Sequence, residues 1–168
     1  MKVLTTLLKT DSSITTALLR VTLGAVFFPH GAQKALGWFG GHGFSGTMGF
    51  FTSQMGIPAL FAFLAIAAEF AGAIALILGA GTRIAALGIA SVMVVAIATV
   101  HGQFGFFMNW TGTQQGEGFE YHLLALAMAV TLVLRGAGAL SVDEVLARKL
   151  EPVTEPKSGA LAPVLRNS

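Results

Sequence analysis

Charged residues are scarce in this chain of 168 residues: only 11% are Asp, Glu, Lys or Arg, whereas 54% are hydrophobic. A soluble domain usually carries about 25% charged residues, so the composition argues against a freely soluble monomer. It also excludes an intrinsically disordered chain, which would need low hydrophobicity. At this length a single domain is expected. The composition therefore predicts a small integral membrane protein, whose few charges carry most of the information.

Cysteine is absent altogether. Disulfides, thiolate catalysis, zinc fingers and cysteine-ligated clusters are thereby excluded. The net charge of +2 is too small and too scattered to suggest nucleic-acid binding. A cleaved signal peptide is a poor interpretation of the N-terminus, because Asp11 and Arg20 interrupt any apolar run there.

Long apolar segments are what the chain does have. A bilayer-spanning helix needs about 20 residues, and four segments approach or reach that length: residues 14–34, 58–79, 82–101 and 120–135. Glycine-rich, aromatic or polar stretches separate them. We therefore expect an all-α fold, a four-transmembrane-helix bundle within a membrane domain of residues 14–140.

The distribution of lysine and arginine predicts the orientation of this bundle. With four spans, both termini lie on one side, and that side carries nine basic residues against a single one, Lys34, on the other. We expect both termini, including an N-terminal segment of residues 1–13, in the cytoplasm. The nine residues are Lys2, Lys9, Arg20, Arg83, Arg135, Arg148, Lys149, Lys157 and Arg166.

Two shorter amphipathic helices are expected outside the spans. Apolar residues at helical spacing follow Ser45, a candidate N-cap, and predict a short helix on the outer surface. Ser141 and Glu144 form a capping box that starts a cytoplasmic helix over residues 141–151. Three prolines in residues 152–168 indicate a flexible tail. The apolar residues are Phe44, Met48, Phe51 and Met55 in the first helix, and Val142, Val145, Leu146 and Leu150 in the second.

Five ionisable residues fall inside or at the outer ends of the predicted spans. Glu69 lies near the membrane centre, where a charge costs at least about 2.5–3.5 kcal/mol and therefore needs a partner or a role. His30 and Lys34 are one turn apart near the outer end of the first span, His101 ends the third, and Glu120 begins the fourth. Each span thus brings an ionisable group to the outer half of the bilayer, which predicts a polar pocket there.

A structural interpretation of the same residues stays open. Glu69 could be a hydrogen-bonded acid without a functional role, and His30 with Lys34 could simply neutralise Glu69 or Glu120. His101 could be an interfacial histidine.

Glu120 and His122 are two residues apart, so only one of them can face the pocket. We favour Glu120 and place His122 at the bilayer interface. Arg20 is expected to be a snorkelling cytoplasmic anchor. No metal site is predicted, because the sequence lacks the Glu-x-x-His pairs of di-iron bundles and the His-Glu-x-x-His motif.

An ordered set of short motifs resembles the DoxX family of small four-helix membrane proteins. The likeness covers about residues 13–145, and by motif match it emphasises the same five positions, His30, Lys34, Glu69, His101 and Glu120. It implies a link to quinone-coupled redox chemistry, since the family includes the large subunit of thiosulfate:quinone oxidoreductase and members associated with oxidative-stress defence. The motifs are LRVTLG (19–24), HGAQK (30–34), GWFGG (37–41), AEFAG (68–72), GTR (81–83) and FEY (119–121). The loop at 102–118 does not match, which leaves the substrate open.

The leading hypothesis is thus an inner-membrane oxidoreductase, or redox subunit, that acts with a quinone. The quinone carbonyls would accept hydrogen bonds from His30, Lys34 or His101, and Glu69 with Glu120 would shuttle protons. Electrons must come from a partner protein, substrate or cofactor. The aromatic residues expected to hold the quinone ring are Phe27, Phe28, Trp38, Phe104 and Phe107.

Two other classes of function compete with this hypothesis. The chain could be a non-catalytic structural or assembly subunit of a larger membrane complex, in which the buried charges only specify helix geometry. It could also be a small proton-coupled carrier, although four spans without inverted repeats do not favour one.

Overall fold

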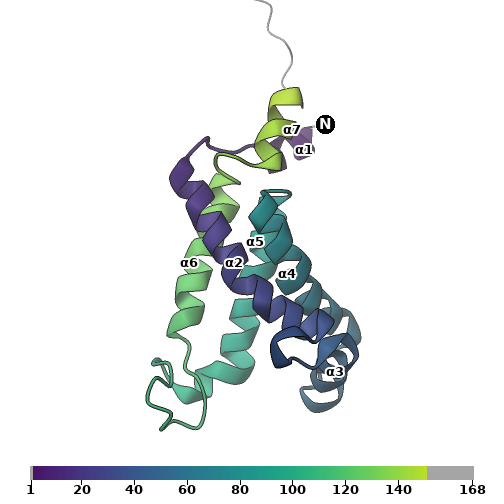
Figure 1. Cartoon of the computed structure of the whole chain (residues 1–168), viewed down its shortest axis with the longest axis vertical. Helices are drawn as coiled ribbons and strands as arrows, with labels where there is room; N and C mark the ends of the chain where they lie inside the picture. The colour runs from purple at the N-terminus through teal and green to yellow at the C-terminus, as the bar shows by residue number, and fades with distance from the viewer. Residues whose placement is uncertain (1, 151–168) are drawn as a thin grey trace, which may run out of the picture.

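The structure of the protein is a computed structural model that describes residues 2–150, with side chains from residue 5 onward. This part of the chain contains seven α-helices and no strand (Figure 1). Four of the helices coincide closely with the predicted apolar segments: α2 (Ile14–Leu36), α4 (Ala59–Leu78), α5 (Thr82–Ala96) and α6 (Glu120–Arg135). The all-α prediction is confirmed, and the predicted tail at 152–168 lies outside the described residues.

Among the described residues, two helices are long and apolar enough to cross a membrane. One is α4, and the other is α5 together with its continuation to Phe104. This continuation consists of a π-helical turn, η3 (Ile97–His101), and a 3₁₀ turn, η4 (Gly102–Phe104). Many large apolar side chains of the bundle point outward, which suits a surface covered by lipid better than one in water. Examples are Leu18, Leu60, Leu64, Ile84 and Leu124.

The core of the bundle combines large side chains with alanines. α2 packs along α4, α4 along α5, and α5 along α6 (Figure 1). Phe27, Leu76, Ile89 and Leu132 fill the centre, one from each helix, and each is almost completely buried. Small residues between them let the helices approach closely, as expected for helices that associate inside a bilayer.

The tightest helix contact is between α2 and α4, and glycine permits it. A Cβ on Gly31 would lie only 2.5 Å from the Cα of Phe70, and one on Gly24 only 2.9 Å from the carbonyl oxygen of Ala73. The two glycines are seven residues apart and therefore share one face of α2. Any larger residue would push the backbones apart, so Gly31 fixes α2 directly against the turn of α4 that carries Glu69.

Two short helices, α1 (Lys2–Leu8) and α7 (Val142–Leu150), lie side by side at one end of the bundle (Figure 1). The Ser12 hydroxyl donates to the Glu144 carboxylate at 2.8 Å and so links the segment after α1 to α7. The predicted N-cap of α7 is confirmed, since Ser141 Oγ accepts from the Glu144 backbone N–H. The apolar stripe of α7 is exposed. Both described chain ends therefore lie at the same end of the molecule.

The predicted outer helix exists at the opposite end as α3 (Gly43–Gly49), extended by the π-helical turn η2 (Phe50–Gln54) (Figure 1). Its N-cap is His42, so the prediction of Ser45 is wrong. The helix begins earlier because Gly43 has a positive φ of 68° and redirects the chain at that point. A 3₁₀ turn, η1 (Trp38–Gly40), connects α2 to this segment.

Arg20 is not a snorkelling anchor, so that expectation is also wrong. Its side chain is 1% exposed, and its guanidinium donates to five backbone carbonyls. The last carbonyls of a helix have no partner within the helix, so they can accept hydrogen bonds from a buried cation and stabilise its charge. The acceptors are Leu76 and Ile77 at the end of α4, and Ala137, Ala139 and Leu140 in the loop before α7.

Asp143 completes this end of the bundle. Its carboxylate accepts from the backbone N–H groups of Gly81, at 2.7 Å, and Thr82, at 2.9 Å, and so caps the N-terminus of α5. Gly79 lies between the hydrogen bonds of Arg20 and those of Asp143. Its φ is positive, at 69°, and a Cβ on it would fall 2.9 Å from the Arg20 guanidinium carbon. The turn between α4 and α5 is thus fixed by one buried cation and one buried anion.

Candidate functional site

The centre of the candidate site is an ion pair between Lys34 on α2 and Glu69 on α4. The Lys34 Nζ lies 2.6 Å from Glu69 Oε2, with the Glu69 side chain 5% exposed and that of Lys34 27% exposed. Lys34 is three residues beyond Gly31, on the same face of α2, so the close helix contact brings the two groups together. The pair offsets the cost of burying either charge alone.

Tyr121 on α6 contacts Phe27 of α2, and sequence reasoning did not single it out. Its ring is stacked on that of Phe27, with centroids 6.4 Å apart and an angle of 25° between the planes. Its hydroxyl is buried and has no hydrogen-bond partner. Phe27 also lies beside His30, with ring centroids 6.4 Å apart, so ring contacts link Tyr121 to the turn of α2 that precedes Lys34. The sequence feature that could have identified Tyr121 is its position in the FEY motif, directly after Glu120.

His101 and His122 form a second polar group beside Tyr121. Their ring centroids are 4.1 Å apart, and His101 Nδ1 lies 2.8 Å from the carbonyl oxygen of Glu117. His122 is 5% exposed, so its predicted place at the bilayer interface is wrong. The reason is helical register: residue 122 shares a face with the buried residues Ala125, Ala129 and Leu132.

Glu120 does not join Glu69 and Lys34. Its carboxylate accepts from the backbone N–H of Met108, at 2.9 Å, and from the indole N–H of Trp110, at 3.2 Å. The backbone N–H of Glu120 in turn donates to Phe106. Glu120 therefore holds the loop between η4 and α6, and the expectation that it faces the same pocket as Glu69 is wrong.

The five aromatic residues expected around a quinone ring lie apart. Phe27 is buried beside Tyr121, whereas Phe28 packs on Phe70 of α4. Trp38 and Phe107 are largely exposed at the two loops of this end. Phe104 packs close to Gly116. Only Phe27 belongs to the cluster around Glu69.

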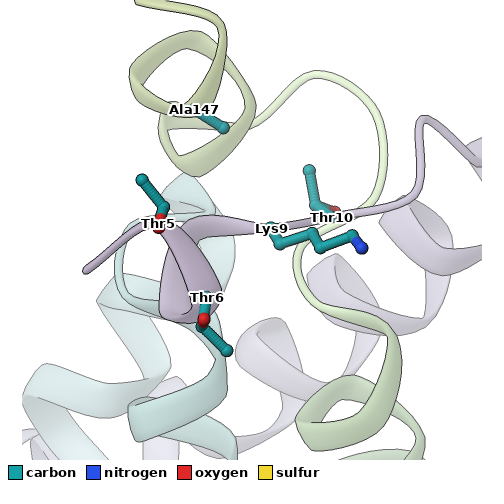
Figure 2. A pocket seen from close by; sticks show the side chains of 5 residues that line it. All are labelled: Thr5, Thr6, Lys9, Thr10 and Ala147. Carbon is teal, nitrogen blue, oxygen red and sulfur yellow. The ribbon is translucent and has the colours of Figure 1, made fainter. Parts of the chain in front are cut away.

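Two other features bear on ligand binding. Within residues 5–150, no group of three or more His, Asp or Glu side chains could hold a metal ion. A cavity of about 330 Å³ lies at the other end of the molecule, between α1 and α7 (Figure 2). Neither a carboxylate nor a histidine lines this cavity, and it is remote from the Lys34–Glu69 pair. Its lining residues are Thr5, Thr6, Lys9, Thr10 and Ala147.

Comparison with known proteins identifies the family to which this helical chain belongs. An all-helical chain with apolar helices and buried ionisable groups is typical of membrane proteins, and the DoxX family model matches residues 15–102. A relative from Bacillus subtilis (strain 168), named "Putative oxidoreductase CatD", is 33% identical over 130 residues, which is 77% of this chain and 85% of the relative. No solved structure matches. The chain belongs to the DoxX family, a family of membrane proteins.

Proposed function

We propose that this protein is an oxidoreductase of the bacterial inner membrane, or the redox subunit of a membrane complex, and that its substrate is a quinone. The observation that carries the proposal is the Lys34–Glu69 ion pair between apolar helices. Ionisable residues are costly in such a place and usually mark a site of proton or ligand handling. The name of the Bacillus subtilis relative supports redox chemistry in general.

The groups around the ion pair suit a quinone. Reduction of a quinone consumes protons as well as electrons, and Glu69, bonded to the Lys34 ammonium, is placed to pass a proton. The buried Tyr121 hydroxyl has a free donor for a carbonyl oxygen. With no cysteine in the chain, the electrons come from a bound reductant or a partner protein.

The membrane topology is part of the proposal. α2, α4, α5 with its continuation, and α6 each cross the bilayer, and the end with α1, α7 and Arg20 faces the cytoplasm. The excess of basic residues at that end supports this orientation. Reporter fusions after residue 150 test it: a reporter active only in the cytoplasm should work there, and activity of a periplasmic reporter would contradict the orientation.

Quinone binding is the central test. The protein in detergent or lipid nanodiscs should co-purify with quinone or bind a short-chain quinone at micromolar concentration. Glu69→Gln and Lys34→Met should each weaken binding at least about tenfold, the value of one lost charged hydrogen bond. Thr99→Val is the control, because the Thr99 hydroxyl bonds only Val95 of its own helix. If no quinone co-purifies and none binds, the proposal fails.

One observation favours a structural subunit instead. The two charges of the Lys34–Glu69 pair satisfy each other, so the pair needs no ligand to be stable. Purification from native membranes distinguishes the two functions. One stoichiometric partner, together with a Glu69→Gln variant that keeps both assembly and activity, would support the structural subunit.

A further inference from the structure

The most informative unassigned feature is a pair of buried polar atoms without partners on neighbouring residues of α6. They are the hydroxyl of Tyr121 and Nδ1 of His122. Nearly all buried polar atoms in folded proteins are hydrogen-bonded, so an exception calls for an occupant that the protein chain itself does not supply. Other described residues also have such atoms, but in Asp11 and Arg83 a second atom of the same group is bonded. The hydroxyl of Thr82 is likewise buried without a partner, but it lies at the opposite end of the bundle, beside the Asp143 cap of α5.

The direction of the Tyr121 hydroxyl is fixed by the packing of its ring. Phe27 lies nearly parallel to one face, and His122 meets the ring at 83° with a centroid distance of 5.6 Å. A phenol held on two sides loses little conformational freedom when its hydroxyl is bonded. It is therefore preorganised for a hydrogen bond.

The surroundings select the chemistry of the occupant. Ring contacts link Tyr121 through Phe27 to His30, which lies one turn of α2 before Lys34, and the Lys34 ammonium donates to Glu69 Oε2. An anion would be repelled by the carboxylate, whereas a neutral molecule with a carbonyl oxygen could accept from the phenol. The flat ring of Phe27 and the apolar helices beside it favour a planar, apolar body.

We propose that Tyr121 is a ligand-binding residue, and that its hydroxyl donates a hydrogen bond to a carbonyl oxygen of the quinone next to Glu69. This rests on the proposed function and adds to it the group that orients the ring. Tyr121 contacts Phe27 of α2 on one side and the His101–His122 pair on the other. The rings of Phe27 and Tyr121 link α2 to α6, with their centroids 6.4 Å apart.

The test uses Tyr121→Phe, which removes one oxygen atom and leaves the ring. Without quinone, the variant should melt no lower than the wild type, because no bond to the protein is lost. Its dissociation constant for a short-chain quinone should rise about tenfold. A clear loss of thermal stability in the variant would show that the hydroxyl has a protein partner, which overturns the proposal.

A spectroscopic readout separates binding from structure. Tyr121 is the only tyrosine of the chain, so tyrosine labelled with ¹³C at the hydroxyl-bearing carbon gives a single NMR signal. That signal should shift when the quinone is added. If the wild type binds quinone but the signal stays in place and Tyr121→Phe binds equally well, the hydroxyl holds only a water and the proposal is wrong, while quinone binding stands. If the wild type binds no quinone, the proposed function itself fails.

Discussion

Each end of the bundle holds one cation of α2, and the two cations have different kinds of partners. Arg20 donates only to backbone carbonyls at the end of α4 and in the loop before α7. Lys34 donates to a side-chain carboxylate. Backbone carbonyls neither titrate nor rotate away, whereas a carboxylate can take up a proton and change partners. The Arg20 contacts are therefore purely structural, whereas proton and ligand exchange at the Lys34 end is what the proposed function requires.

The surroundings of the two cations can be compared in the same way. Near Arg20, the backbone N–H groups of Gly81 and Thr82 are capped by Asp143, and Arg83 bonds the carbonyls at the end of α6. Near Lys34, Tyr121 and His122 keep buried polar atoms without partners. Asp11, Thr82 and Arg83 at the Arg20 end also keep buried atoms without partners. The two ends therefore differ in the kind of partner that each cation has, and not in the presence of unsatisfied polar atoms.

Replacement of Arg20 by methionine should produce the largest loss of stability. The substitution leaves five carbonyl acceptors without their donor, and hydrogen bonds to a charged group are worth about 1.5–3 kcal/mol each, so we expect a loss of at least about 3 kcal/mol. The measurement is thermal unfolding in detergent. Arg135→Met is the control, because Arg135 is exposed and its pair with Asp11 spans 3.4 Å. Equal losses in the two variants would abolish the distinction between the ends.

Removal of the Glu69 and Lys34 charges, separately and together, should give a smaller loss of stability than removal of Arg20. Glu69→Gln leaves the Lys34 ammonium without its carboxylate, and we expect a loss of about 2–3 kcal/mol, because Lys34 is partly exposed and can reach solvent. Adding Lys34→Met should recover part of it, with a coupling energy of about 1–3 kcal/mol in a double-mutant cycle. Quinone binding should not recover in the double variant. Additive effects on stability would mean that the pair is not coupled.

The helices were predictable because their signals are local. Apolar runs and the glycines that end them defined all four long helices to within a few residues, and Ser141 marked the start of α7. These features depend on one helix at a time. The contact of Lys34 with Glu69 was one of the two pairings that the sequence left open, and the structure shows it.

The errors arose where two or more helices decide a side chain's environment. Arg20 and Lys34 are both basic residues of α2, and only the positions of α4 and of the loop before α7 show that the first is enclosed by carbonyls. The choice between Glu120 and His122 depended on the rotation of α6, which the sequence pattern left open. Tyr121 was missed because its importance comes from an absent hydrogen bond.

Enlargement of Gly31 tests how the helix contact positions the ion pair. Gly31→Ala would place a methyl group against the backbone of Phe70, and overpacking of this kind costs about 1–3 kcal/mol. Gly49→Ala in α3 is the matched control, because a Cβ there has open space, and we expect a gain of about 0.5–1 kcal/mol. Thermal unfolding of both variants measures the difference. A neutral Gly31→Ala variant would show that α2 can shift without loss, and Lys34 would then not depend on this contact.

The smallest expected effect is a pH dependence at the Arg20 end. The hydrogen bond from Ser12, followed by the charge of Arg148, lowers the pKa of Glu144 from its ordinary value of 4.5. Because the pKa is lower in the folded state, the ionised group stabilises the fold above pH 4.5, and this contribution is lost as the pH falls through the lowered pKa. The melting temperature should therefore drop slightly more between pH 5 and pH 3 in the wild type than in Ser12→Ala, about as expected for an exposed carboxylate. Identical pH profiles would mean that the Ser12–Glu144 bond does not hold the segment after α1 against α7 in solution.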